Sequence, residues 1–239
     1  MMLNAWEGSR SGAANMERDM DLLDMVRRGD VALAFRTYTW EPWTVSLGKH
    51  QQDEQIDREA LVNSGFDLVR RPTGGRAVLH AEELTYCIAI PVTDTRTPRA
   101  VYAGIHTMLL SALQPFVPGL SFEEAPSDLQ HHYATSGALA VSCFTSSART
   151  EIVHGNRKVV GSAQRVIDNV ILQHGSILTG PGHLMIGNVV RASADERARL
   201  TETLMASSVS LSEASDRIIT PEDIAEAIHA TASEHLRHI

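Results

Sequence analysis

The sequence predicts an α+β fold in which a mixed, largely antiparallel sheet is flanked by helices. Three observations support this prediction. Several segments repeat apolar residues at helical spacing, short runs of β-branched and apolar residues lie between them, and a Gly-Asn pair at residues 155–156 suits a tight hairpin. The chain has 239 residues and no clear interdomain linker. We therefore expect one catalytic domain over residues 1–239.

The first half of the chain is expected to begin with an amphipathic helix over residues 15–28. Apolar residues recur there every three or four positions, and Gly29 provides a stop. The segments that follow are two strands around the break at Pro42, a short helix closed by Gly65, and two apolar runs short enough to be buried strands. In order, these segments are residues 31–38, 43–47, 57–64, 66–70 and 84–90.

The second half is expected to contain a helix, a polar stretch, three strands and a final helix. The first five of these are residues 100–113, 121–136, 151–153, 158–166 and 170–178. The polar stretch is long for a loop inside a compact domain, which predicts that it is either functional or mobile. Thr220 offers a capping residue and Pro221 a first-turn proline, so the final helix is expected to begin there.

Composition excludes several classes of protein. The chain lacks an apolar run of the roughly 18 residues that a membrane span needs, and its first residues lack the features of a signal peptide, so a cytoplasmic protein is expected. The net charge of −8 argues against nonspecific nucleic-acid binding. Two cysteines are too few for a disulfide framework or a Cys-x-x-Cys metal site, and the His131-His132 pair is read as solvated loop, so no metal is expected.

The use of lysine is unusual. Lys and Arg together number 21, but the only lysines are Lys49 and Lys158. A lysine can lose its proton and present a compact ammonium group, whereas arginine stays charged. Codon bias is the favoured explanation for Lys49. Lys158 is a candidate functional residue because it opens a motif described below.

Residues 70–80 form the first candidate motif, a run rich in glycine and arginine between two apolar strands. Adjacent glycines allow close approach of a ligand to the backbone, and the arginines and threonine can donate to phosphate or carbonyl oxygens. An ordinary turn with a solvated face is the alternative interpretation. The candidate substrate-binding residues in this run are Arg71, Thr73, Gly74, Gly75, Arg76 and His80.

A second candidate motif pairs residues 158–164 with residues 173–177. Small residues interrupt strands that otherwise consist of valine, isoleucine and leucine, and this usually marks the close approach of a ligand or another backbone. The alternatives are a β-bulge at Gly161 and a core histidine at His174. The candidate substrate-binding residues here are Gly161, Ser162, Ala163, His174 and Gly175.

The two cysteines lie in different surroundings. A lone cysteine is more often a small buried hydrophobic residue than a nucleophile. Cys87 fits that interpretation, because Tyr86 and Ile88 flank it in an expected core strand. Cys143 fits it less well, because it lies in the small, polar run of residues 142–146.

Taken together, the runs at residues 70–80, 158–164 and 172–178 resemble the biotin and lipoate protein ligase superfamily, and are most similar to its cysteine-dependent octanoyltransferases. The resemblance implies a ligase-like catalytic domain in which Cys143 is the acyl-thioester nucleophile and Lys158 lowers its pKa. It also implies octanoyl-acyl carrier protein as donor, a lysine of a lipoyl carrier domain or glycine cleavage carrier protein as acceptor, and no cofactor. Backbone N–H groups at residues 74–75 or 161–162 would hold the oxyanion, and His80 or His174 would position the reacting groups.

Three alternatives stay open at this point. An ATP-dependent lipoate or octanoate ligase belongs to the same superfamily, but similar ligases have a third glycine where this chain has Arg76 and have no cysteine matching Cys143. Octanoyl transfer between carrier domains is a second alternative. A noncatalytic acyl-binding protein is the third, and its support is that Ala81 replaces the aspartate that usually follows the loop histidine.

Overall fold

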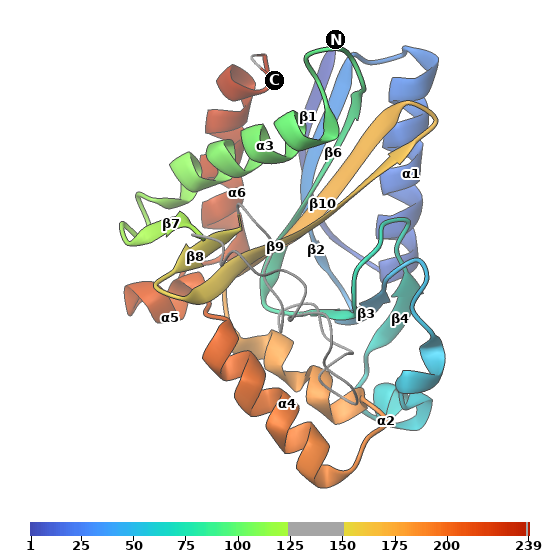
Figure 1. Cartoon of the computed structure of the whole chain (residues 1–239), viewed down its shortest axis with the longest axis vertical. Coiled ribbons are helices and arrows are strands. Elements are labelled where there is room, and N and C mark those ends of the chain that lie inside the picture. The colour runs from blue at the N-terminus through green and yellow to red at the C-terminus, as the bar shows by residue number, and fades with distance from the viewer. Residues whose placement is uncertain (124–150, 238) are drawn as a thin grey trace.

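A computed structural model describes residues 1–123, 151–237 and 239. Its main sheet has seven strands in the order β1-β2-β6-β10-β9-β8-β7, and Figure 1 shows it running through the centre of the molecule. Neighbouring strands are antiparallel except for β1 and β2, which are parallel. The predicted mixed, largely antiparallel sheet is therefore confirmed.

The predicted strands and helices of the main sheet and its two faces are present, and β1, β7 and α5 are additional elements that the sequence did not predict. The strands are β1 (Met2–Arg10), β2 (Leu33–Trp40), β6 (Glu83–Pro91), β7 (Leu120–Phe122), β8 (Ile152–His154), β9 (Arg157–Ile167) and β10 (Val170–Leu178). The helices are α1 (Gly12–Arg28), α3 (Pro98–Leu113), α5 (Leu211–Ser215) and α6 (Pro221–His235). The hairpin predicted at residues 155–156 joins β8 to β9.

A second sheet, which the sequence did not predict as a separate unit, has the strand order β4-β3-β5. Its strands are β3 (Thr44–Leu47), β4 (Asp67–Arg70) and β5 (Val78–His80), and around it lie α2 (Arg58–Asn63), α4 (Ala194–Ser207) and the 3₁₀ segments η1 (Asp53–Gln55) and η4 (Pro181–Val189). The expectation that residues 66–70 form a buried strand was wrong for β4, whose residues are half-buried or exposed. β4 lies at the edge of this sheet, which leaves one side of the strand open.

The helices cover the main sheet on both faces. α3 and α6 pack on one face and α1 packs on the other, as Figure 1 shows. The apolar side chains of each face form separate buried clusters, and a third cluster lies between the second sheet, α2, η4 and α4. The two faces explain why the central strands β6 and β10 are buried along almost their whole length.

The predicted helix ends agree with the structure within a few residues. α1 begins at Gly12, capped by Ser11, rather than at residue 15, and it ends before Gly29 as predicted. The last helix has a complete capping box, because the side chain of Thr220 accepts from the N–H of Asp223 and the Asp223 carboxylate accepts from the N–H of Thr220. Such boxes satisfy the N–H groups that a helix start leaves without partners.

Several elements were missed by the sequence analysis. α4 buries only Leu200 and Leu204, so its apolar stripe is too sparse for periodicity to reveal. Its capping box at Ser193 and Glu196 was the available signal. β1 has no buried residue in its pattern, since it forms the edge of the main sheet, and β5 is only three residues long.

A buried ion network joins β1, α1 and β2. Arg36 is fully buried and donates two hydrogen bonds to Asp19 Oδ1, at 2.9 Å from Nε and 2.7 Å from Nη2. Its Nη1 donates to Glu7 Oε2 at 3.0 Å, and its Nη2 donates to the Asn15 carbonyl at 2.7 Å. A charge in the core is tolerated only when it is paired and hydrogen-bonded in this way. The network therefore fixes α1 on the face of the main sheet.

Replacing Arg36 by methionine tests how strongly this network contributes to stability. The change would leave the buried Asp19 carboxylate without its cation, so the free energy of unfolding in urea should fall by about 3–5 kcal/mol. Arg27→Met is the matched control, because Arg27 pairs with Asp24 and Asp168 at the surface and its loss should cost less than about 1 kcal/mol. Equal, small losses in the two variants would contradict the assigned role of the network.

Candidate functional site

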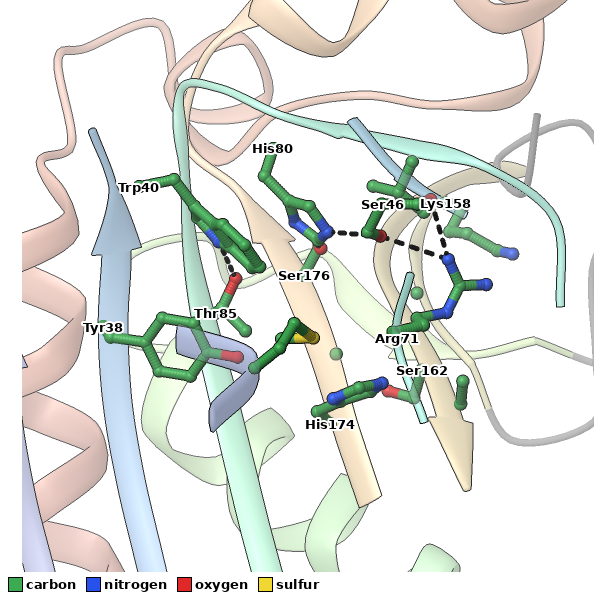
Figure 2. A pocket seen from close by; sticks show the side chains of 15 residues that line it. Tyr38, Trp40, Ser46, Arg71, His80, Thr85, Lys158, Ser162, His174 and Ser176 are labelled. Atoms are coloured by element: carbon green, nitrogen blue, oxygen red, sulfur yellow. Dashed lines mark hydrogen bonds between the residues drawn. The ribbon is translucent and has the colours of Figure 1, made fainter. Parts of the chain in front are cut away.

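A pocket lies where strands of both sheets meet the N-terminal half of α1. Figure 2 shows its two ends: Tyr38 and Trp40 lie on one side, and Arg71 and Lys158 lie on the opposite side. The pocket thus has an aromatic end and a cationic end. Its lining residues are Met16, Tyr38, Trp40, Ser46, Arg71, Val78, His80, Thr85, Lys158, Gly161, Ser162, Ala163, His174, Gly175 and Ser176.

The pocket brings together most of the residues that the sequence singled out. The predicted residues that line it are Arg71, His80, Lys158, Gly161, Ser162, Ala163, His174 and Gly175. Thr73, Gly74, Gly75 and Arg76 do not line it but lie in the loop that carries Arg71. Cys143 and the predicted polar stretch beyond residue 123 lie outside the described residues. The lining residues that were not among the predicted site residues are Met16, Tyr38, Trp40, Ser46, Val78, Thr85 and Ser176.

Arg71 shapes the loop of residues 71–77, here called the glycine-arginine loop. Its side chain is buried, and its Nη2 donates to the carbonyls of Gly74 at 2.8 Å and Arg76 at 2.7 Å. Its Nη1 donates to Ser46, at 3.0 Å to the carbonyl and 3.1 Å to the hydroxyl. Arg71 therefore holds its own loop in a fixed curve and ties that loop to β3, in addition to lining the pocket.

The end of β3 packs directly against the glycine-arginine loop. A side chain at Gly48 would place its Cβ 1.8 Å from the carbonyl oxygen of Gly75, so only glycine fits there. Gly75 has φ of +95°, a backbone conformation that residues with a side chain rarely adopt. The N–H of Lys49 donates to the carbonyl of Thr73 at 2.8 Å. The loop is thus held from outside as well as by Arg71.

His174 connects the glycine-arginine loop to α1. Its Nε2 is 2.6 Å from the hydroxyl of Thr73, and its Nδ1 is 3.2 Å from Asp19 Oδ2. Burial lowers the pKa of His174, although Asp19 opposes that effect. Burial alone would raise the pKa of Asp19, but the hydrogen bond from His174 and the charge of Arg36 outweigh it and hold the pKa below its usual value. His174 is therefore both a hydrogen-bonded core residue and a residue of the pocket.

His80 makes a similar set of contacts on β5. Its Nε2 is 2.8 Å from the Ser46 hydroxyl, and its Nδ1 is 2.8 Å from Glu83 Oε1. The His80 ring stacks on Trp40 with ring centroids 4.1 Å apart. The indole N–H of Trp40 donates to the Thr85 hydroxyl at 2.7 Å, as Figure 2 shows. These contacts fix the aromatic end of the pocket.

Lys158 lies on β9 at the cationic end of the pocket. Its side chain is only 4% exposed, and its Nζ is 2.7 Å from Glu151 Oε2. Further along β9, Gly161 pairs with Ser176 in a regular ladder, so it is not a bulge. A Cβ at Gly175 would lie 2.7 Å from the Gly161 carbonyl, which means that the crowding between β9 and β10 requires glycine there.

The Ser162 hydroxyl contacts two side chains, one from β6 and one from α3. Its hydroxyl is 2.7 Å from the Tyr86 hydroxyl and 3.1 Å from His106 Nε2. Burial lowers the pKa of His106 to about 4, and the charge of Lys158 contributes to this effect. Since His106 Nδ1 is 2.8 Å from the Tyr102 carbonyl, the neutral ring donates there and leaves Nε2 to accept from Ser162.

Ala81, the residue after the loop histidine His80, is buried against η4. A Cβ at Gly182 would lie 2.8 Å from the Ala81 Cβ, so the backbone of η4 occupies the space beside this residue. The neighbouring Glu82 accepts from the N–H of Gly182 at 2.8 Å. Glu82 thus places a carboxylate at the start of η4.

Cys87 fits the expectation of a core residue. Cys87 is fully buried in β6, and burial raises the pKa of its thiol, so the prediction of a core residue is confirmed. Within residues 1–123 and 151–237, no group of three or more His, Cys, Asp or Glu side chains is arranged to bind a metal ion. In the same part of the chain, none of the helices combines the length and apolar character that crossing a membrane requires.

Comparison with known proteins gives a consistent result. The lipoyl protein ligase A/B catalytic domain family matches residues 11–233. The octanoyltransferase LipM of Kyrpidia tusciae is 35% identical over 234 residues, which cover 96% of this chain and 85% of that protein. The octanoyltransferase LipM of Staphylococcus aureus is 32% identical over 225 residues, which cover 92% of this chain and 81% of that protein.

Solved structures of lipoate protein ligases have the same fold. A bipartite lipoate protein ligase from Thermoplasma acidophilum superposes with a TM-score of 0.72 at 16% identity, covering 99% of this chain and 85% of that one. A lipoate-protein ligase A bound with ATP gives a TM-score of 0.67 at 19% identity, with 99% and 85% of the two chains covered. At these identities the two structures bear on the fold alone.

The buried, neutral His106 predicts a specific pH dependence of stability. The ordinary pKa of 6.5 applies in the unfolded chain and the folded value is about 4. Between these two values the unfolded state binds more protons, so the free energy of unfolding should fall as the pH is lowered through this window, by at most about 3 kcal/mol from this residue. His106→Gln should remove that part of the slope in urea denaturation. Identical slopes for the two proteins would contradict the assignment.

Proposed function

The chain belongs to the lipoyl protein ligase A/B catalytic domain family, and we propose that it moves an octanoyl group from acyl carrier protein, through a thioester on Cys143, to a lysine of a lipoyl carrier domain. It is an acyltransferase of lipoate biosynthesis that acts on carrier proteins, as relatives named octanoyltransferase LipM match most of its length at 32% and 35% identity. We further propose the identity of the donor, the identity of the acceptor and the roles of the residues.

The main support for this proposal is that the pocket is aromatic at one end and has cationic side chains at the other. The aromatic end at Tyr38 and Trp40 suits an eight-carbon chain, because apolar walls favour removal of such a chain from water. The cationic end at Arg71 and Lys158 suits the oxygen of a reacting acyl group. An acyl chain that enters with its carbonyl last would thus have the reacting carbon beside Lys158.

The chemistry requires two exchanges at that carbon. The thiolate of Cys143 attacks the donor thioester carbonyl, and the donor thiol leaves as the new thioester bond to Cys143 forms. The neutral amine of the carrier lysine then attacks this thioester and the Cys143 thiolate leaves. The octanoyl group stays on the lysine as an amide, and the proton that the amine loses restores the Cys143 thiol. Neither exchange consumes ATP.

The described residues support both exchanges. An ammonium group beside a thiol favours its thiolate, and Lys158 is held in place by Glu151 at 2.7 Å. The backbone N–H groups of residues 74–75 or 161–162 are candidates for stabilising the oxyanion. The contacts of Arg71, Gly48 and His174 with the glycine-arginine loop support the first pair, since a fixed loop costs no reorganisation during the reaction.

An ATP-dependent ligase remains the alternative to be tested. This chain shares its fold with solved structures of lipoate protein ligases, yet a shared fold leaves the reaction open. Arg76 in place of the third glycine, together with the presence of Cys143, favours thioester transfer. Transfer of octanoyl between carrier domains would use the same residues with a different donor.

A single catalytic domain over residues 1–239 and a cytoplasmic location also stay predictions.

Incubation with octanoyl-acyl carrier protein should add one octanoyl group to the protein. The adduct is expected in the intact-protein mass, and hydroxylamine should remove it because thioesters are labile to that reagent. Cys143→Ala should give no adduct, whereas Cys87→Ala should still form one, since Cys87 is buried in the core.

The same assay with octanoate and ATP in place of the thioester donor tests the alternative. Thioester transfer predicts no modification of a lipoyl domain under these conditions. Strong modification that persists in Cys143→Ala would overturn the proposal in favour of an ATP-dependent ligase.

The role of Lys158 can be measured on the protein without any substrate. In Lys158→Ala, iodoacetamide should alkylate Cys143 roughly 3- to 10-fold more slowly at neutral pH, because a nearby cation that favours the thiolate is lost. Peptide mass analysis separates Cys143 from Cys87. Lys49→Ala is the matched control and should leave the rate unchanged. An unchanged rate in Lys158→Ala would refute this role.

A further inference from the structure

We propose that Asp19 is a positioning residue of this enzyme: through His174 it orients the hydroxyl of Thr73 and so fixes the glycine-arginine loop at the pocket. This inference rests on the function proposed above. Neither Asp19 nor its buried partner Arg36 belongs to a motif that the sequence analysis singled out. Neither residue lines the pocket: Asp19 contacts two lining residues, His174 and Tyr38, and its link to the glycine-arginine loop runs through His174.

The contacts form an unbroken chain from the core to the loop. Arg36 donates twice to one oxygen of Asp19, Oδ1, which leaves Oδ2 for His174 at 3.2 Å and for the Tyr38 hydroxyl at 3.1 Å. His174 continues to Thr73 at 2.6 Å. Asp19, Arg36 and Thr73 are fully buried, and His174 is only 6% exposed. Water therefore offers little competition for these bonds.

The direction of each hydrogen bond follows from what its groups can donate. An ionised carboxylate can only accept, so His174 Nδ1 must carry the proton that points at Asp19. Burial disfavours the doubly protonated ring, so His174 Nε2 keeps its lone pair. The Thr73 hydroxyl then has to donate to Nε2. Asp19 thereby selects the tautomer of His174, and this tautomer selects the orientation of Thr73.

The orientation of Thr73 matters because the loop begins its turn there. Its hydroxyl is committed to His174 and its carbonyl accepts from the N–H of Lys49 at 2.8 Å. With both groups held, the backbone that follows at Gly74 and Gly75 has a fixed starting direction. A loop whose N–H groups serve a developing oxyanion needs that preorganisation.

A second relay repeats the same arrangement on β5. His80 has Glu83 at its Nδ1 and the Ser46 hydroxyl at its Nε2, both at 2.8 Å. Ser46 in turn accepts from Arg71 of the loop at 3.1 Å. Figure 2 shows the two histidines reaching the pocket from different strands. Two carboxylate–histidine–hydroxyl relays that both end on one loop support a positioning role better than either relay alone.

Asp19→Asn tests the inference with almost no change in shape. The oxygen of the introduced amide would face Arg36, so its NH₂ group would face His174 and move the ring proton to Nε2. The ¹⁵N chemical shifts of His174 should show a protonated Nδ1 in the wild type and a protonated Nε2 in the variant. Octanoyl transfer should fall roughly 10- to 100-fold in kcat with a smaller change in KM, a loss of the size seen when the carboxylate that orients a metal-binding histidine is removed.

Glu7→Gln is the matched control, because it removes a carboxylate from the same Arg36 without a contact to His174. It should keep the wild-type tautomer and transfer rate. The inference is overturned if His174 of the active wild type carries its proton on Nε2, or if Glu7→Gln lowers kcat as much as Asp19→Asn. An absent octanoyl adduct in the wild type would instead overturn the proposed function, because the tautomer is read without substrate.

Thr73 provides an independent pair of variants in case Asp19→Asn does not fold. Thr73→Val keeps the shape and removes the hydroxyl, so transfer should fall roughly 10-fold or more. Thr73→Ser restores the hydroxyl and should recover most of the wild-type kcat. Equal activity in the two variants, with both folded by circular dichroism, would contradict a role for the Thr73 hydroxyl.

Discussion

The buried ion pair between Arg36 and Asp19 is the interaction on which the rest of the structure depends. It places a full positive charge on β2 in the buried interior, where an unpaired charge would be strongly destabilising. The pair is tolerated because Glu7 and Asn15 supply further acceptors, and the Arg36 guanidinium also lies 3.7 Å from the centroid of the Tyr38 ring. These contacts hold β1, α1 and β2 together, and they leave Oδ2 of Asp19 to accept from His174 and Tyr38, two residues that line the pocket.

The pocket follows from this arrangement and from the second sheet. α1 brings Met16 to one wall and, through Asp19, holds His174 of β10, while β3 and β5 bring Ser46 and His80 to another wall. Each wall contains a histidine whose ring is held at both nitrogens, so the polar groups of the site have little freedom. An acyl-transfer site gains from such rigidity, because the groups that stabilise the oxyanion are already in position before the charge develops.

Sequence patterns predicted the parts of this structure that are local. Helical spacing and capping residues identified α1, α3 and α6, and the Gly-Asn turn identified the β8–β9 hairpin. The loop motif identified Arg71 and His80 as pocket residues. The ion network escaped notice because Asp19 lies in an amphipathic helix and resembles a solvated residue there, while Tyr38, Trp40 and Ser46 look like ordinary strand residues. Their roles depend on contacts between segments far apart in the chain. The role of Cys143 as nucleophile stays a prediction.

A crystal structure of the protein after reaction with octanoyl-acyl carrier protein tests the central claim most directly. The claim is that a single pocket holds the acyl chain against aromatic rings and the reacting carbonyl against cations. We expect acyl density that runs from Tyr38 and Trp40 toward Lys158 and is bonded to the sulfur of Cys143. An acyl chain bound elsewhere, for example in the groove between β1 and α6 lined by Trp6 and His229, would contradict the account.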